Sequence, residues 1–219
     1  EPGDDNMGTK SLGKDATGSM PPPLPPDGDC TYNPATRQPV WHTDSLYRKS
    51  PPIGSAFYCK EAPPEGAGTC FADMVAAYAG LPEARRQELE GLESVCSLAH
   101  HDTKLYRLYH NDQLPPEPLL SEEQRAANPP TRCPLVLRHP HTGRKALSGL
   151  NSSTCRIVPT GHPVSAEEIE EYELGGKEHP SVEIWRTMLP EVTTREYALV
   201  WQWQAGDLAC WDNRCLIHA

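Results

Sequence analysis

Proline is spread along the whole chain, and its distribution limits the possible folds more than any other feature of the sequence. A proline lacks a backbone N–H, so it is excluded from helix interiors and from central strands. The 219 residues contain 24 prolines and 16 glycines, and they occur in every part of the chain. This pattern favours a loop-rich β protein over a helical bundle.

Residues 1–30 form a low-complexity segment that ends in MPPPLPPDGDC. Proline-rich segments of this kind are extended, so we expect an extended or mobile arm here. The remaining residues, 31–219, are enough for one sizeable domain with a buried core.

The strongest helix signal covers residues 69–95, TCFADMVAAYAGLPEARRQELEGLESV. Thr69 is expected to cap the first turn, and the carboxylate of Asp73 suits the positive end of a helix. The sequence Gly-Leu-Pro at positions 80–82 is expected to divide the segment into two helices. The sequence therefore predicts a helical pair in its first half.

Strands are expected later in the chain. Residues 134–147 read as a strand, a turn and a second strand. The tail alternates clearly, and four of its side chains share one face under the two-residue period of a strand: Tyr197, Leu199, Trp201 and Trp203. We expect that face to be buried against an opposing sheet. Helices early and strands late indicate an α+β chain built on a β-sandwich or barrel.

The charge balance narrows the class of partner. The formal net charge of -10 disfavours binding to nucleic acid or to an acidic membrane surface. No run of about 18 apolar residues occurs, so no membrane span is expected. The start of the chain is acidic and polar, which does not fit a signal peptide, and it lacks an initiator Met. We therefore expect a cytoplasmic chain that is processed or incomplete at its front.

The 8 cysteines give two alternatives. Their even number allows a disulfide-linked secreted module. No C-x-x-C pair occurs, which argues against a zinc ribbon. Several cysteines stand in apolar sequence, such as Cys59 in AFYCK and Cys210 in DLACW, where a free thiol behaves as a small buried hydrophobe. This context favours reduced, intracellular thiols.

His42 and Asp44, in the sequence WHTD, are a candidate pair of metal ligands. In an extended strand their side chains leave on the same face and can converge on one ion. The spacing by itself is weak evidence, because His100 and Asp102 repeat it. We interpret that second pair as a solvated connection without a chemical role. The simple alternative for His42 and Asp44 is a strand end that faces water.

A non-haem iron(II) site of the two-histidine, one-carboxylate type needs one more ligand from elsewhere in the chain. His218 is a candidate, since it ends the final predicted strand in an apolar context. From the residues alone it can equally be an ordinary histidine near the chain end. His139 and His141 also form a spaced pair, but they flank a proline and precede a turn glycine, so we interpret them as structural.

Four segments of the chain resemble one enzyme family. They are WHTD, PPEGAGTCFADM, RHPHTGRKAL and WQAGDLACWDNRCLIHA, and their order and rough spacing are similar to those of the taurine catabolism dioxygenases (TauD/TfdA). The resemblance extends from about residue 38 to residue 219. It implies a double-stranded β-helix, or jelly-roll, core with flanking helices and a metal between its two sheets.

The resemblance also implies a function and a set of site residues. Members of this family are Fe(II)- and 2-oxoglutarate-dependent dioxygenases that use O2 to hydroxylate a small organic substrate, with succinate and CO2 as co-products. Fe(2+) would be held by His42, Asp44 and His218, and Thr69 would contact 2-oxoglutarate. Trp211 and Asn213 would support the distal strand.

The chain also departs from the family pattern. The family places an Arg that binds the far carboxylate of 2-oxoglutarate some ten to fifteen residues after its distal His, whereas this sequence ends one residue after His218. Ser148 stands where an aromatic residue is usual. The resemblance therefore implies an incomplete jelly-roll without its C-terminal strand, and weak 2-oxoglutarate binding by these 219 residues. An inactive relative that only binds a metal or a partner is the alternative.

Overall fold

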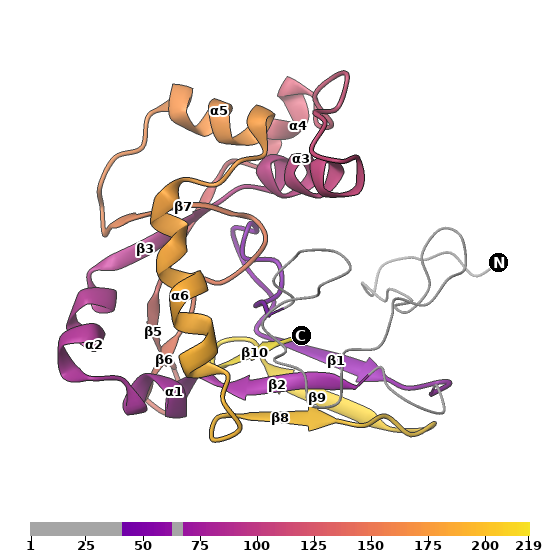
Figure 1. Cartoon of the computed structure of the whole chain (residues 1–219), viewed down its shortest axis with the longest axis vertical. Helices are drawn as coiled ribbons and strands as arrows, with labels where there is room; N and C mark the ends of the chain where they lie inside the picture. The colour runs from indigo at the N-terminus through magenta and orange to yellow at the C-terminus, as the bar shows by residue number, and fades with distance from the viewer. Residues whose placement is uncertain (1–40, 63–67) are drawn as a thin grey trace.

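Short antiparallel strands and short helices alternate along the chain (Figure 1). The computed structural model describes residues 41–62 and 68–219, so the arm predicted for residues 1–30 lies outside the described residues. The helices are α1 (Met74–Gly80), α2 (Glu83–Glu90), α3 (Leu98–Tyr109), α4 (Glu122–Ala127), α5 (Ala166–Gly175), the 3-10 turn η1 (Pro180–Val182) and α6 (Glu183–Val192). The strands are β1 (Gly54–Tyr58), β2 (Thr69–Asp73), β3 (Leu92–Cys96), β4 (Thr131–Pro134), β5 (Val136–Arg138), β6 (Lys145–Leu147), β7 (Thr154–Pro159), β8 (Ala198–Trp201), β9 (Leu208–Asp212) and β10 (Leu216–His218).

The described strands form small antiparallel sheets in the orders β1-β9, β10-β2-β8, β4-β3-β7 and β5-β6. The first two of these sheets lie together at one end of the molecule, and α3, α4 and α5 lie at the other (Figure 1). The predicted mixture of helices and sheets is confirmed, but the predicted order of helices early and strands late is wrong, because β1 and β2 precede α1 and the helices continue to α6. Because β1 and β2 pair with β9 and β10, the two ends of the described chain are brought together.

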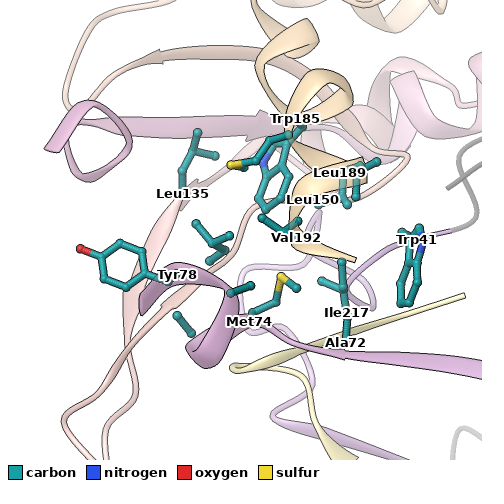
Figure 2. Packing of buried hydrophobic residues seen from close by; sticks show 14 of the residues in the cluster. Trp41, Ala72, Met74, Tyr78, Leu135, Leu150, Trp185, Leu189, Val192 and Ile217 are labelled. Atoms are coloured by element: carbon teal, nitrogen blue, oxygen red, sulfur yellow. The ribbon is translucent and has the colours of Figure 1, made fainter. Parts of the chain in front are cut away.

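The main hydrophobic core joins α1 and α6 to β2, β6 and β10 (Figure 2). Trp185 of α6, Met74 of α1 and Ile217 of β10 are fully buried in it, and Trp41 is 2% exposed. Trp41 and Ile217 directly precede His42 and His218 in the sequence. Burial of these two apolar side chains therefore fixes the position of the backbone that carries both histidines.

The predicted division into two helices is confirmed, because α1 ends at Gly80 and α2 begins at Glu83. The predicted cap is wrong. Thr69 begins β2, which is hydrogen-bonded to β8 on one side and to β10 on the other. The N-cap is Asp73, whose Oδ1 accepts hydrogen bonds from the backbone N–H groups of Val75 at 2.8 Å and Ala76 at 3.0 Å. Pairing on both sides of β2 holds its residues extended, so the helix begins later than the sequence predicted.

The prediction of a buried tryptophan face in the tail is also wrong. Leu199 and Trp201 are 56% and 44% exposed, and Val200, on the opposite face of β8, is 46% exposed. Within the described residues β8 pairs only with β2, at the edge of its sheet. Tyr197 packs against the main core and Trp203 donates to Thr69, and both are partly buried, so this face is covered at its two ends and exposed at Leu199 and Trp201 on the edge strand.

His100 and its surroundings differ from the solvated connection that we expected. His100 lies inside α3 and is fully buried. Its Nδ1–H donates to the backbone carbonyl of Tyr172 at 3.0 Å. Burial lowers the pKa of His100 to about 4, so the ring is neutral near pH 7. The packing of α3 against α5 explains this burial, and it depends on contacts between distant segments.

The cysteines of the described residues are free thiols: Cys59, Cys70, Cys96, Cys133, Cys155, Cys210 and Cys215. The burial that we expected of Cys59 and Cys210 is wrong, because Cys59 is only partly buried and Cys210 is exposed. Cys30 lies outside the described residues. None of the helices between residues 41 and 219 that the structure describes is both long enough and apolar enough to cross a membrane.

Candidate metal centre

His42 and His218 face each other in a single antiparallel bridge at the meeting point of the two chain ends. The backbone N–H of His42 donates to the carbonyl of His218 at 2.9 Å, and the N–H of His218 donates to the carbonyl of His42 at 3.0 Å. The two imidazole ring centroids are 4.2 Å apart. The backbone pairing therefore places the two rings side by side.

Asp44 completes the cluster. Its Oδ1 lies 3.5 Å from Nε2 of His42 and 3.7 Å from Nε2 of His218. One donor atom from each of the three residues lies within 4.8 Å of the other two. The structure thus brings together the three residues that the sequence singled out as candidate ligands.

Aromatic side chains enclose one side of this cluster. The rings of Phe57 in β1, Phe71 in β2 and Trp211 in β9 lie 6.2, 6.3 and 4.8 Å from the ring of His218, between centroids. His218 is only 4% exposed. The side chains of His42 and Asp44 are partly exposed, so the cluster is closed behind His218 and open toward solvent on the other side.

The protonation states suit metal binding. Burial raises the pKa of Asp44, but hydrogen bonds from His42 and Ser55 and the nearby imidazoles outweigh it and lower that pKa to about 2. Burial lowers the pKa of His218 to about 4, with a smaller contribution of the same sign from His42. Near pH 7 the cluster therefore offers an ionised carboxylate and a neutral imidazole, which are the forms that bind metals.

The donor set and its spacing fit a divalent ion. Two imidazole nitrogens and one carboxylate oxygen are the ligands of the facial type of non-haem iron site. With metal–ligand bonds of about 2.1 Å, adjacent donors lie about 3 Å apart. The measured 3.5 and 3.7 Å need only small side-chain shifts to reach that spacing. Nδ1 of His218 is buried without a hydrogen-bond partner in the described structure, so aromatic packing holds that ring.

Thr69, which the sequence suggested as a 2-oxoglutarate contact, lies on the same strand as part of the aromatic enclosure. Side chains two residues apart in a strand point to one face, so Thr69 and Phe71 share the side of β2 that faces His218. The Thr69 hydroxyl accepts a hydrogen bond from the indole N–H of Trp203 at 2.9 Å. Its own hydrogen remains available for another acceptor.

A second cluster of metal-ligand residue types consists of His139, Asp212 and Cys215. The backbone N–H of Thr142 donates to Nδ1 of His139 at 3.2 Å, so Nε2 carries the hydrogen and donates to Asp212 Oδ2 at 3.1 Å. Arg214 also pairs with both oxygens of Asp212. The positive charge of Arg214 would repel a metal cation at this position. We therefore interpret the cluster as a set of structural hydrogen bonds, which is the role that we expected of His139 from the sequence. His141 is exposed.

Three residues close to the cluster were not singled out by the sequence: Ser55, Phe57 and Phe71. Ser55 donates a hydrogen bond to the carboxylate of Asp44. Phe57 and Phe71 form part of the aromatic enclosure of His218. Ser55 and Phe57 lie outside the four motifs, and Phe71 lies inside one of them without a role assigned to it. The pairing of β1 with β9 and of β2 with β10 places all three here.

Known proteins are similar to this chain over most of its length. The chain is 34% identical over 182 residues to the alpha-ketoglutarate-dependent 2,4-dichlorophenoxyacetate dioxygenase of Cupriavidus pinatubonensis, covering 82% of this chain and 53% of that protein. It is 33% identical over 179 residues to the (S)-phenoxypropionate/alpha-ketoglutarate-dioxygenase of Delftia acidovorans, covering 82% of this chain and 54% of that protein. The chain therefore spans about half the length of these curated relatives.

Solved structures are similar as well. AAD-2 in complex with Mn(II) and N-oxalylglycine superposes with a TM-score of 0.61 at 27% identity, over 82% of this chain and 60% of that one. A taurine dioxygenase from Burkholderia xenovorans superposes with a TM-score of 0.55 at 26% identity, over 81% of this chain and 50% of that one. The family model for the taurine catabolism dioxygenase TauD, TfdA family matches residues 19–219. The chain belongs to this family.

Proposed function

We propose that this chain is the metal-binding part of an Fe(II)- and 2-oxoglutarate-dependent dioxygenase that hydroxylates a small organic substrate and forms succinate and CO2. The observation that carries the proposal is the convergence of His42, Asp44 and His218 on one point. Family membership supports it, because two of the relatives are named as alpha-ketoglutarate-dependent dioxygenases. We also propose that residues 31–219 form one domain with a jelly-roll core, preceded by the arm at residues 1–30.

In this proposal the three side chains hold the ion through Nε2 of each histidine and Oδ1 of Asp44. Such a facial set leaves three positions open for the cosubstrate and oxygen. Bound there, Fe(II) would supply the redox chemistry of oxygen activation and 2-oxoglutarate decarboxylation. The aromatic enclosure of Phe57, Phe71 and Trp211 keeps water away from the buried side of His218. The partly exposed side of His42 and Asp44 is where the cosubstrate and substrate would enter.

Thr69 is proposed to contact 2-oxoglutarate. Its hydroxyl oxygen already accepts from Trp203, and the hydroxyl hydrogen can therefore be donated to a carboxylate. A neutral hydrogen bond of this kind contributes about 1 kcal/mol. A carboxylate held by Thr69 alone would thus bind only weakly, and a cationic side chain would add more.

Aryloxyalkanoic acids are the first substrate class to test, since the two relatives above are named for 2,4-dichlorophenoxyacetate and (S)-phenoxypropionate. The assay measures succinate formed from 2-oxoglutarate with Fe(II), ascorbate and O2, for each candidate acid. The 219 residues are assayed, and so is any longer protein that contains them. We expect succinate that depends on Fe(II) and on the substrate, and loss of it in His218→Ala. Metal binding without succinate in every protein tested would instead support a non-catalytic, metal-binding relative.

A further inference from the structure

A chain of hydrogen bonds connects the aromatic enclosure to the carboxylate of Asp44. The indole N–H of Trp211 donates to Oδ1 of Asn213 at 2.8 Å. The amide Nδ2 of Asn213 donates to Oγ of Ser55 at 3.0 Å and to the carbonyl of Pro52 at 3.2 Å. Oγ of Ser55 donates to Oδ2 of Asp44 at 2.5 Å. Four side chains from three segments of the chain are thus connected by successive hydrogen bonds.

The direction of every bond in this chain is determined by chemistry. An indole N–H can only donate, so the atom of Asn213 that faces Trp211 must be its oxygen. The amide nitrogen then faces Pro52 and Ser55, and a carbonyl such as that of Pro52 can only accept. Because the oxygen of Ser55 is occupied as an acceptor, its hydrogen is directed to Asp44. An ionised carboxylate oxygen can only accept, so Oδ2 of Asp44 receives this hydrogen.

Backbone pairing places these residues next to one another. Ser55 is opposite Trp211 in the register between β1 and β9, and the backbone N–H of Asn213 donates to the carbonyl of Ile53 at 3.1 Å. Trp211 and Asn213 are 6% and 5% exposed. Because Trp211 and Asn213 are buried beside a paired strand, their hydrogen bonds hold them in one orientation. The same bonds fix the orientation of the Ser55 hydroxyl, which in turn fixes the carboxylate of Asp44.

The two oxygens of Asp44 consequently have different surroundings. Oδ2 is held by Ser55, while Oδ1 faces both histidines. We propose that Ser55, oriented by Asn213 and Trp211, is a positioning residue that restricts Asp44 to binding the metal through one oxygen. This inference rests on the proposed metal centre at His42, Asp44 and His218.

Binding of the metal through one oxygen of Asp44 matters for the proposed reaction. An octahedral ion with three protein donors has three positions left. A 2-oxo acid that chelates through two oxygens would use two of them, which would leave one for O2. A carboxylate that turned to bind through both oxygens would fill one of these positions. By holding Oδ2, Ser55 would keep Asp44 from doing so.

The test compares Ser55→Ala with Ser55→Thr, which keeps a hydroxyl, and with Ser50→Ala, which removes an exposed serine from the loop before β1. Affinity for Mn(II) is measured by anaerobic calorimetry. Loss of an outer partner of a metal ligand weakens binding about 10–100-fold. We expect that loss in Ser55→Ala, with binding close to the original in Ser55→Thr and Ser50→Ala. If the alanine variant is unstable, Ser55→Cys gives the same test, because a thiol has a similar shape but is a poor hydrogen-bond donor.

A second readout distinguishes positioning from general support of the fold. The anaerobic visible absorption band of Fe(II) chelated by 2-oxoglutarate is recorded for each variant, together with its melting temperature. We expect a weaker band in Ser55→Ala at an unchanged melting temperature. If the original chain binds Mn(II) and Ser55→Ala binds it equally well, the role of Ser55 is wrong and the metal centre stands. If the original chain binds no Mn(II), the metal centre itself is wrong.

Discussion

His42 and His218 are paired through their backbones, since each N–H donates to the carbonyl oxygen of the other. The side chains of two candidate metal ligands are therefore aligned by main-chain hydrogen bonds that do not depend on the imidazoles. A mutation of either ring removes a donor atom and leaves the pairing intact. Ligand loss and loss of the fold can thus be measured separately.

We expect His42→Ala to lose metal affinity by more than 100-fold, because removal of a ligand costs more than removal of an outer partner. His141→Ala is the matched control, since His141 is exposed and belongs to neither cluster. Anaerobic titration with Mn(II) measures both variants. Equal affinities in the two variants would contradict the assignment of His42.

Asp73 is expected to stabilise α1 as its N-cap. Loss of a capping side chain costs about 0.5–2 kcal/mol, so Asp73→Ala should lower the free energy of unfolding by that amount. Asp73→Asn should retain most of the stability, because an asparagine side chain accepts the same hydrogen bonds from Val75 and Ala76. Urea denaturation measures both. An alanine variant as stable as the original chain would mean that Asp73 does not cap the helix.

Two tryptophans should respond very differently to truncation. Trp185 is fully buried between α6 and the rest of the main core, and Trp→Ala at such a site costs about 3–5 kcal/mol. Trp201 is 44% exposed on β8, so its replacement should cost less than about 1 kcal/mol. Melting temperatures of Trp185→Ala and Trp201→Ala give the comparison, with Trp185→Phe as a milder core variant. A large loss at Trp201 would show that its face is covered in solution.

His100 should make the stability depend on pH. Its pKa is about 4 in the folded chain, against about 6.5 for an unperturbed histidine. Between these values the unfolded chain binds more protons, so the contribution of His100 is complete above about pH 6.5 and is lost as the pH falls toward 4. The difference is on the order of 3 kcal/mol. Unfolding free energies measured from pH 4 to 7 should show this slope.

His100→Asn is the control for that slope. An asparagine amide can donate to the carbonyl of Tyr172 as the imidazole Nδ1–H does, but it does not titrate. The variant should be less dependent on pH between 4 and 6.5 than the original chain. If both show the same dependence, His100 is not buried in its neutral form.

Local features were predictable from the sequence. The break between α1 and α2 follows from a proline, which cannot continue a helix, and the strand, turn and strand of β5 and β6 follow from a turn glycine between apolar runs. His42 and Asp44 do converge, but not on a strand as the sequence predicted, because His42 lies in an isolated bridge and Asp44 in the turn that follows it. The match of four ordered motifs to one family then favoured His218, which the residues alone left open as either a ligand or an ordinary histidine.

Contacts between distant segments decided the rest. Alternation in the tail indicated that Leu199 and Trp201 share a face, but burial depends on whether another element covers these positions, and on the edge strand β8 both remain exposed. The helix cap is Asp73 and not the predicted Thr69, because β2 is paired with a strand on each side. These strand hydrogen bonds outweigh the local preference of Thr69 for a capping position. The connection of Ser55 to Asp44 arises from the pairing of β1 with β9. Sequence patterns report the preferences of neighbouring residues, whereas coverage of a face and contact between strands are properties of the whole packed chain.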